Sequence, residues 1–388
     1  MKILFVLTYY RPHVSGLTIY VQRLAEALAA RGHRVTVLTS QYDRALPAEE
    51  KMDGVRIVRV PVWFRISKGC IMPRFPLYAH RLIAEHDVLS VHLPQFEASL
   101  LGFLGRFVTR RPVILTYHCD LQLPHGLFNR FVDKVVFVSN WIAGQLADRI
   151  VAYTQDYAEH SPYLSQFLEK VRVIPPPVRM PAVDPKGRAA LCQAYDLNGR
   201  VVIGFAARVA AEKGVEYLLS ALPLIRERIP NAYLLLAGPY QDVLGENAYF
   251  RKLEPLIQAN QGYLKFLGVL DPQEMANFFS AIDVLVVSSV NSTESFGLVQ
   301  VESMLCGTPV VASNLPGVRQ PVYMTGMGQV VPIRDPVAIA DAVVEVVQHR
   351  ERYVRPRREI EAIFDLEVTL REYEELFAAE MERVSGRA

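Results

Sequence analysis

Residues 281–313 of the chain have the sequence AIDVLVVSSVNSTESFGLVQVESMLCGTPVVAS. Two short runs within it, 284–287 and 310–312, are rich in valine, which is typical of strands buried on both faces of a sheet. A polar loop and a segment with helical spacing of apolar residues lie between the two runs. A strand, a helix and a second strand in this order predict a parallel sheet covered by helices.

The same alternation of short apolar runs and helical patterns extends along most of the chain. In GLTIYVQRLAEALAARG, residues 16–32, apolar side chains recur at three- and four-residue spacing and Gly32 provides a stop. A long helix is predicted over 126–147. The predicted strands are 3–8, 35–39, 55–60, 88–92, 113–117, 150–153 and 171–174 in the first half, and 201–206, 233–237, 264–267, 284–287, 310–312 and 329–331 in the second.

A proline-rich segment separates the two halves. VIPPPVRMPAVDPK, residues 173–186, holds five prolines between Pro175 and Pro185, and closely spaced prolines favour extended backbone. The sequence therefore predicts two Rossmann-like, doubly wound α/β domains that face one another across a cleft. We expect the first to comprise residues 1–178, joined by the amphipathic helix at 366–388, and the second to comprise 179–365.

Composition excludes several classes of protein. With 388 residues, 51% of them hydrophobic and 21% charged, the chain has a soluble globular composition. No apolar run reaches the roughly 20 residues of a membrane-spanning helix, and the first residues lack a signal-peptide cleavage site, so we expect a cytoplasmic protein. The four cysteines lack metal-ligand spacing and are predicted to be buried or half-buried free thiols.

Charge is distributed unevenly between the halves. Residues 1–178 contain 21 Lys and Arg against 14 Asp and Glu, a net charge of +7, whereas the remainder has a net charge of −5. A basic first half suggests an anionic partner, such as a phospholipid surface or a phosphorylated acceptor. Nothing in the pattern indicates nucleic-acid binding.

Open parallel sheets bind ligands at the carboxyl ends of their strands, so the loops there are the candidate site. After strand 201–206 the sequence ARVAAEKG places Arg208 and Lys213 just before a helix, an arrangement that favours an anion. The next two loops, GPY from Gly238 and GVLD with Leu270, offer backbone that could lie flat against a base. Each of these signals is weak alone, and surface solvation explains the two cations equally well.

The loop after strand 284–287 carries two carboxylates, Glu294 and Glu302. We expect Ser295, Phe296, Gly297 and Leu298 to begin the next helix, with the N–H groups from Ser295 through Val299 directed at phosphate or sugar oxygens. On that helix Glu302 would lie two turns on, about 12 Å further along. Carboxylates accept hydrogen bonds from vicinal hydroxyls, so the pair is predicted to bind a sugar and a ribose.

These motifs resemble those of the retaining glycosyltransferases of family 4, which have the two-domain GT-B fold. RVAAEKGVEYLLSAL, LLLAGPY, FLGVLDPQEMANFFSAIDVLVVSS and TESFGLVQVESMLCGTPVVASNLPGVRQPV carry the resemblance in the second half, and YYRPHVSGLTIYVQRLAEALAARGHRVTVLT carries it in the first. The family often has two adjacent glycines where this chain has Ser15 and Gly16. The resemblance therefore implies only the approach of Gly16 to the donor phosphates.

The same resemblance implies roles for residues in the first half. TYHCD would be the family's histidine loop, in which His118 reaches across the cleft to the donor sugar. From the residues alone, a single histidine at the end of a strand is more often structural. ADRIVAYTQDYAE is similar to the family's strand and helix cap, with Thr154 at the cap. The rival segment DKVVFVSNW is assigned to the long helix instead.

The implied reaction is retaining transfer of a hexose from a nucleoside diphosphate sugar to a glycan, lipid-linked or small-molecule acceptor. Arg208, Lys213 and the helix N–H groups would stabilise charge on the departing diphosphate, Glu294 would position the sugar and Glu302 the ribose. The sequence has no suitably placed Asp-x-Asp element, so the cations are expected to replace a metal. No resident cofactor is expected, because the sugar nucleotide is a substrate.

Three alternatives belong to other classes. A dinucleotide-dependent oxidoreductase would need G-x-G-x-x-G after the first strand, and TYYRPHVSG does not provide it. A sugar-nucleotide epimerase of similar fold would need acids on both sides of the cleft. A catalytically silent sugar-nucleotide-binding protein would be expected to lose the charged residues that are present here.

One segment of the first half suggests contact with an anionic membrane, which would place the protein at the inner face of the membrane. VPVWFRISKGCIMPRFPLYAHRLI, residues 60–83, interleaves aromatic and aliphatic residues with Arg and Lys, as interfacial segments do. Packing of the same apolar residues into the core is an equally good interpretation. The apolar residues in question are Trp63, Phe64, Ile66, Ile71, Met72, Phe75 and Leu77, and the cations are Arg65, Lys68, Arg74 and Arg81.

Overall fold

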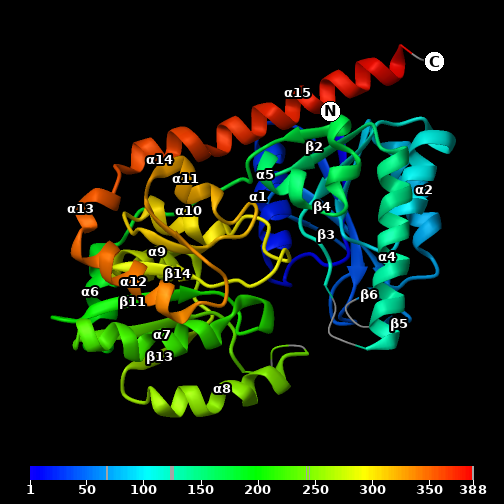
Figure 1. Cartoon of the computed structure of the whole chain (residues 1–388). Coiled ribbons are helices and arrows are strands. Elements are labelled where there is room, and N and C mark those ends of the chain that lie inside the picture. Colours follow the sequence, from blue (N-terminus) through cyan, green and yellow to red (C-terminus); the bar gives the residue numbers. More distant parts are fainter. Residues whose placement is uncertain (67–68, 123–125, 242, 244, 387–388) are drawn as a thin grey trace. The chain divides into compact units, whose positions relative to one another are not determined.

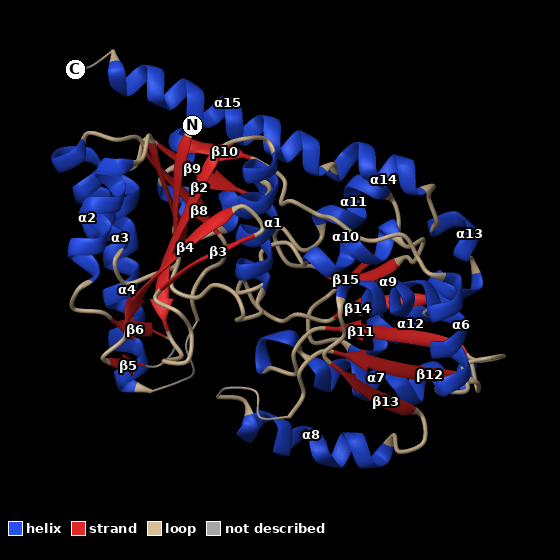
Figure 2. Cartoon of the chain, turned by 180° about the vertical axis from the view of Figure 1, so that it is seen from behind, coloured by secondary structure: helices blue, strands red, loops and turns tan. Residues whose placement is uncertain are grey.

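The chain forms two compact units (Figures 1 and 2). This computed structural model describes residues 1–66, 69–122, 126–241, 243 and 245–386. Unit 1 comprises Met1–Pro177 and Leu366–Ala388, and unit 2 comprises Val178–Asp365. The chain changes units within the proline-rich segment, where Ile174, Val178 and Met180 are buried, so this connection packs against the units.

Unit 1 contains a sheet of eight strands in the order β10-β9-β8-β7-β1-β2-β4-β3. All neighbours are parallel except β3 and β4. The strands are β1 (Lys2–Val6), β2 (Arg34–Gln41), β3 (Glu49–Met52), β4 (Val55–Pro61), β7 (Val88–Leu93), β8 (Val113–Tyr117), β9 (Arg149–Ala152) and β10 (Val171–Val173), and β5 (Phe64–Ile66) pairs separately with β6 (Gly69–Ile71).

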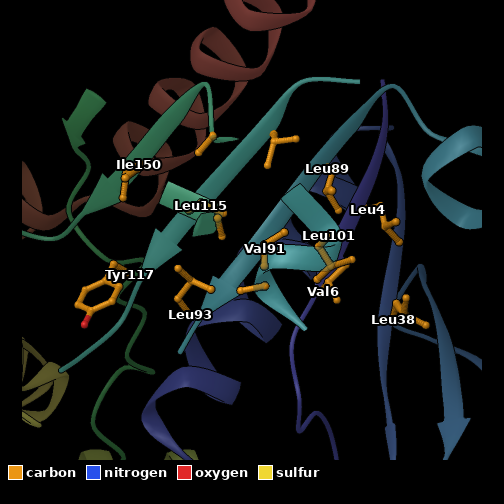
Figure 3. Close-up of a cluster of buried hydrophobic side chains, with 14 of the residues drawn as sticks. Leu4, Val6, Leu38, Leu89, Val91, Leu93, Leu101, Leu115, Tyr117 and Ile150 are labelled. Atoms are coloured by element: carbon orange, nitrogen blue, oxygen red, sulfur yellow. The ribbon is translucent and has the colours of Figure 1, made fainter. Parts of the chain in front are cut away.

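Helices cover both faces of this sheet. They are α1 (Gly16–Ala30), α2 (Phe75–Glu85), α3 (Ala98–Phe103), the π-helical turn η1 (Leu104–Thr109), α4 (Leu127–Leu146), α5 (Gln155–His160), the short turns η2 (Leu164–Gln166) and η3 (Leu168–Lys170), and α15 (Leu366–Ser385). Figure 2 draws α2, α3 and α4 together along one side of the sheet. The buried cluster beneath them includes Leu4, Val6, Leu89, Leu101 and Leu115, which are all fully buried (Figure 3).

The opposite face of the sheet is covered by α1 and the C-terminal helix α15. Phe5 alternates with Leu4 and Val6 along β1, so it points to this second face, where its ring packs against Phe377 of α15. Tyr373 of α15 is fully buried as well, and its hydroxyl lies 2.6 Å from that of Tyr20 in α1. Since one face of α15 belongs to the core, residues 366–385 are an integral part of unit 1.

Unit 2 contains a six-stranded parallel sheet in the order β13-β12-β11-β14-β15-β16. Its strands are β11 (Val201–Ala206), β12 (Ala232–Ala237), β13 (Leu264–Gly268), β14 (Val284–Val287), β15 (Val310–Ser313) and β16 (Gly328–Val331). Its helices are α6 (Pro185–Ala194), the 3₁₀ turn η4 (Ala211–Lys213), α7 (Val215–Arg228), α8 (Asn247–Ala259), α9 (Pro272–Ala281), α10 (Leu298–Leu305), α11 (Gln320–Thr325), α12 (Pro336–Gln348), α13 (Arg350–Tyr353) and α14 (Arg357–Phe364).

The predicted doubly wound architecture in two domains is confirmed, and the predicted strands lie within two residues of observed ones. The antiparallel strand β3 and the β5–β6 hairpin were not predicted, because their sequences contain charged residues and glycine in place of an apolar run. The four cysteines are unpaired, with Cys70 buried and the others half-buried, as predicted. In the described part of the chain, no helix is both long and apolar enough to cross a membrane.

Candidate active site

In unit 2 the predicted charged residues lie at the point where the strand order reverses. The chain runs from β11 outward to β12 and β13, and then returns to place β14 on the other side of β11. The loops after β11 and β14 therefore leave neighbouring strands in different directions. The crevice between two such loops is the usual ligand site of an open α/β sheet. The first loop contains Arg208 and Lys213, and the second contains Glu294.

Backbone contacts hold these two loops together. The amide of Val290 donates to the carbonyl of Glu212 at 3.0 Å, and the hydroxyl of Ser288 donates to the carbonyl of Lys213 at 2.9 Å. Val215, the first residue of α7, donates its amide to the Tyr249 hydroxyl at 3.1 Å. The position of Lys213 relative to the second loop is thus fixed by several hydrogen bonds.

Lys213 and Glu294 form an ion pair between the two loops. Both side chains are partly accessible, at 20% and 17% exposure, and the Ser289 hydroxyl lies 3.5 Å from the Glu294 carboxylate. Arg208 forms a second ion pair, with Glu212 one turn further along. The two cations predicted to converge on an anion therefore each have a carboxylate partner within the unit.

The helix after Glu294 begins later than predicted. It starts at Leu298, because Gly297 adopts a left-handed conformation with φ of 76°, which ends the preceding turn. Ser295 and Phe296 therefore belong to the turn, and Phe296 is buried with its ring against Phe364. Among the described residues no side chain caps α10, so its first amides, Leu298 and Val299, face a site that favours an anion.

The second carboxylate of the predicted pair lies within α10. Glu302 is 8% exposed, and the neighbouring thiol of Cys306 has a pKa of about 12, raised by burial and, to a smaller extent, by the charge of Glu302. Because α10 begins only at Leu298, the predicted helical separation of about 12 Å between Glu294 and Glu302 does not apply.

The two remaining positions of unit 2 that were predicted to bind the donor lie at the same edge of its sheet. Gly238 follows β12 with φ of 125°, and a Cβ there would lie 2.3 Å from the carbonyl oxygen of Ala207. Only glycine lets the loops after β11 and β12 approach this closely. Leu270 is half-buried in the loop after β13. In the part of the chain that the structure describes, no three His, Cys, Asp or Glu side chains gather as metal ligands.

In unit 1 the order reverses between β1 and β7, and Gly16 begins the helix after β1. Ser15 caps this helix by accepting a hydrogen bond from the amide of Thr18 at 3.2 Å. No described atom lies within 4 Å of the position of a Cβ at Gly16, so its backbone is open to approach. Thr154 caps α5 through the amide of Tyr157, which agrees with the predicted helix cap.

His118 follows β8 and is 5% exposed. One ring nitrogen, Nε2, lies 2.9 Å from Nδ1 of His92, and the other is hydrogen-bonded to the hydroxyl of Tyr153. Burial, followed by the proximity of His92, holds the pKa of His118 well below its usual value. The imidazole is therefore neutral at pH 7, and a contact between either ring nitrogen and a sugar requires exchange of an existing hydrogen bond.

The partners of His118 were missed by the sequence analysis. His92 is the fifth residue of β7 and is fully buried, with a pKa of about 3 caused by that burial. Its Nε2 has no hydrogen-bond partner among the described residues. A histidine inside an otherwise apolar strand was the available signal. Glu97, beyond the end of β7, has a pKa raised by burial to about 7 and was likewise not predicted.

Two loops at a sheet reversal, an ion pair and an uncapped helix terminus together form the candidate site of unit 2. Solved structures share the fold of this chain. The chain superposes on HepE from Anabaena with a TM-score of 0.78 and 21% identity over 98% of this chain and 100% of that one. It superposes on sucrose-phosphate synthase from Thermosynechococcus elongatus with a TM-score of 0.76 and 25% identity over 97% and 99%. The fold is therefore that of a GT-B glycosyltransferase.

Family models match both halves of the chain. Residues 14–180 match the model described as Glycosyltransferase Family 4, and residues 200–349 match the model described as Glycosyl transferases group 1. The chain belongs to glycosyltransferase family 4. It is 28% identical to phosphatidyl-myo-inositol mannosyltransferase of Mycobacterium tuberculosis, over 91% of this chain and 90% of that protein. It is 29% identical to D-inositol 3-phosphate glycosyltransferase of Xylanimonas cellulosilytica, over 84% and 82%.

Proposed function

We propose that the protein transfers a hexose, with retention of configuration and without a metal ion, from a nucleoside diphosphate sugar to an inositol-containing lipid acceptor. The observation that carries this proposal is the Lys213–Glu294 ion pair beside the uncapped amino end of α10, at the sheet reversal of unit 2. Relatives that act on phosphatidyl-myo-inositol and inositol 3-phosphate support the acceptor class. HepE, which was solved with UDP-glucose, supports the donor class.

The cations of the two ion pairs stabilise the negative charge of the leaving group. As the bond between the sugar carbon C1 and the diphosphate oxygen breaks, negative charge grows on the diphosphate. Lys213 then exchanges Glu294 for phosphate oxygen, and Arg208 exchanges Glu212 in the same way. Each exchange replaces one carboxylate with another anion, so neither cation is left unpaired during the reaction.

Retention follows if the acceptor hydroxyl attacks C1 from the face that the diphosphate leaves. The new bond joins the acceptor oxygen to C1, and the acceptor proton passes to a diphosphate oxygen. Glu294, released from Lys213, accepts hydrogen bonds from sugar hydroxyls, and Glu302 binds the ribose. His118 donates or accepts one hydrogen bond to the sugar while it remains neutral.

A panel of radiolabelled UDP, GDP and ADP sugars, incubated with phosphatidylinositol in detergent and with free inositol phosphate, tests this function. We expect label in the acceptor from one donor, at the same rate with a chelator present, and an unchanged anomeric configuration by NMR. Interconversion of the nucleotide sugar without an acceptor would indicate an epimerase. Tight binding of the nucleotide without turnover on any acceptor would indicate a silent binding protein.

A further inference from the structure

The helix α4 exposes a continuous stripe of large apolar side chains, which we call the α4 stripe. Between 38% and 65% of each of these side chains is exposed. The spacing of three and four residues aligns them along one face of a 20-residue helix about 30 Å long. The members of the α4 stripe are Phe128, Phe131, Val135, Val138, Trp141 and Ile142.

The opposite face of α4 already provides the helix with its packing. Val132, Val136 and Ala143 are buried, and the hydroxyl of Ser139 donates to the carbonyl of Phe96 at 2.7 Å. An ordinary surface helix pairs such an inward apolar face with an outward polar one. In α4 both faces are apolar, so the α4 stripe is not needed to hold the helix on its sheet.

The exposed apolar surface extends beyond α4. Phe103, at the end of α3, is 50% exposed, and Phe107 and Val108 of η1 are 57% and 47% exposed. Helix α3 packs against α4, and η1 packs against α3 and α2. Thus nine large apolar side chains of α3, η1 and α4 are exposed on the side of the unit 1 sheet where Figure 2 draws α3 and α4. Monomeric soluble proteins rarely expose a contiguous apolar surface of this extent.

Cations accompany these apolar residues. Arg130 and Lys134 are exposed one turn apart along one edge of the α4 stripe, and Arg106 and Arg110 are exposed on and beside η1. The sequence of residues 98–147 contains five Arg and Lys but only two acids, Asp120 and Asp133. Asp120 is buried and accepts hydrogen bonds from two hydroxyls. The surface therefore combines apolar groups with a local excess of positive charge.

We propose that the α4 stripe, with the exposed side chains of α3 and η1, docks unit 1 on an anionic lipid bilayer. Aromatic and aliphatic side chains enter the acyl boundary at such a surface while Arg and Lys contact the headgroups. This proposal rests on the proposed function, because a lipid acceptor is presented only at a membrane surface. It assigns the contact to the exposed side chains of α3, η1 and α4 instead of the segment predicted from the sequence.

The structure weakens the predicted segment as a membrane contact. Met72 and Phe75 are buried in the core of unit 1 and Ile71 is half-buried, as the alternative interpretation expected. Trp63, Phe64 and Leu77 remain exposed. Lys68 and the side chain of Ile66 lie outside the described residues.

A second copy of the chain fits this surface less well than a bilayer does. A two-fold interface brings the same patch of both copies together, so it would collect Arg106, Arg110, Arg130 and Lys134 twice. Asp148 pairs with Arg106 at 3.7 Å, but the other three cations would still face their own copies, and like charges across an interface cost affinity. Anionic headgroups neutralise these charges directly.

Co-sedimentation with vesicles of equal parts phosphatidylglycerol and phosphatidylcholine tests the docking surface. The wild-type protein should sediment, and Phe131→Asp combined with Val138→Asp should reduce partitioning at least about tenfold, since both acids enter the acyl boundary. Arg130→Gln and Lys134→Gln should each reduce it about fivefold on these vesicles and leave it unchanged on neutral ones. Roughly 1 M salt should abolish the contribution of the cations.

Two matched controls locate the effect. Tyr323→Asp combined with Val337→Asp replaces two comparably exposed apolar residues of unit 2 and should sediment like the wild type. Trp63→Asp combined with Phe64→Asp should have a smaller effect than the α4 variant. The proposal would be overturned if the α4 variant, Phe131→Asp with Val138→Asp, sedimented as well as the wild type. It would also be overturned if Trp63→Asp with Phe64→Asp reduced vesicle binding more than the α4 variant does. Concentration-dependent dimers that the α4 variant abolishes, with no vesicle binding, would overturn it in favour of self-association.

The test separates docking from catalysis. Circular dichroism should show that the α4 variant is folded, and calorimetry with UDP, GDP and ADP should give wild-type nucleotide affinity. Turnover of phosphatidylinositol in detergent micelles without vesicle binding would remove the docking surface and leave the proposed function intact. Vesicle binding without turnover of any donor would leave the docking surface and remove the proposed function.

Discussion

The two polar clusters of the molecule handle charge in opposite ways. In unit 2 Lys213, Glu294, Arg208 and Glu212 form partly exposed ion pairs at a sheet reversal. In unit 1 the imidazoles of His92 and His118 are nearly or fully buried, and their pKa values are depressed by that burial. The first cluster can exchange one anion for another at little desolvation cost. The second cannot hold a positive charge and acts only through neutral hydrogen bonds.

In the proposed function, this contrast divides the work between the two units. Charge that grows on a leaving diphosphate is stabilised by preorganised cations, and unit 2 provides Lys213 and Arg208. Recognition of sugar hydroxyls needs fixed donors and acceptors without net charge, and the histidine cluster offers them. The predictions below test the contrast by removing one property of one cluster at a time.

The largest effect is expected from Lys213→Ala. Removing this cation leaves Glu294 without its partner and the diphosphate without its counter-charge, so turnover should fall by roughly 100-fold or more, as for loss of one preorganised donor. Stopped assays with saturating donor measure this. Lys265→Ala, which removes an exposed cation of the same unit from β13, is the control and should retain wild-type turnover. Near-normal turnover in Lys213→Ala would end the assignment of an anion site.

The two glutamates should separate binding from transfer. Glu302→Ala removes the acceptor predicted for the ribose and should weaken binding of the free nucleoside diphosphate by about 1.5–3 kcal/mol, the range for hydrogen bonds to a charged group. Glu294→Ala releases Lys213, so nucleoside diphosphate should bind as well as before or better, while transfer falls. Titration calorimetry on both variants decides this, and the opposite pattern would exchange the two roles.

Acid should destabilise unit 1 through its histidines. A protein is destabilised by acid when one of its histidines has a lower pKa in the folded state than in the unfolded state. As pH falls below the unfolded pKa, the unfolded chain binds a proton that the folded chain does not, and the free energy of unfolding decreases. His92, with a folded pKa of about 3 against an ordinary value of 6.5, should contribute a loss of about 2 kcal/mol between pH 7 and pH 5. Denaturant unfolding at both pH values measures the loss.

The same experiment with His92→Gln provides the comparison. The variant lacks the titrating ring, so its own loss of stability between pH 7 and pH 5 should be smaller than that of the wild type by about 2 kcal/mol. Equal pH dependence in the two proteins would show that His92 is accessible to protons in the folded state.

The sequence predicted the charged cluster better than the neutral one, for a physical reason. Arg208, Lys213 and Glu294 are charged residues in loops after apolar strands, so their strand-end position could be inferred from periodicity. Their pairing could not, because it depends on how two loops more than 70 residues apart are joined by the hydrogen bonds of Ser288 and Val290. The start of α10 was predicted too early because Gly297 in TESFGLV is compatible both with the interior of a helix and with its beginning. Its positive φ, which places the start at Leu298, cannot be inferred from the sequence.

The hydrogen-bond partners of His118 and the exposure of the α4 stripe could not be predicted without the three-dimensional structure. His92 and Tyr153 come from different strands or strand ends, and only the order β9-β8-β7 brings them to His118. In α4 the periodicity predicted the helix, yet an apolar residue at any position is compatible with core or surface. Phe131 is exposed because Val132 and Val136, on the opposite face of α4, are the residues buried in unit 1, and the sequence does not show which face is buried.

The smallest effect is expected from Tyr153→Phe, which tests whether the neutral cluster positions His118. The hydroxyl of Tyr153 is hydrogen-bonded to Nδ1 of His118 and helps to fix which ring nitrogen carries the proton. Without it His118 keeps its contact with His92 but can adopt either tautomer, and kcat should fall about fivefold to tenfold, as for one neutral hydrogen bond. The KM for the donor should change little, and NMR of the ring nitrogens should show a changed tautomer population. A merely structural role would lower the melting temperature and leave both the tautomer and kcat at their wild-type values.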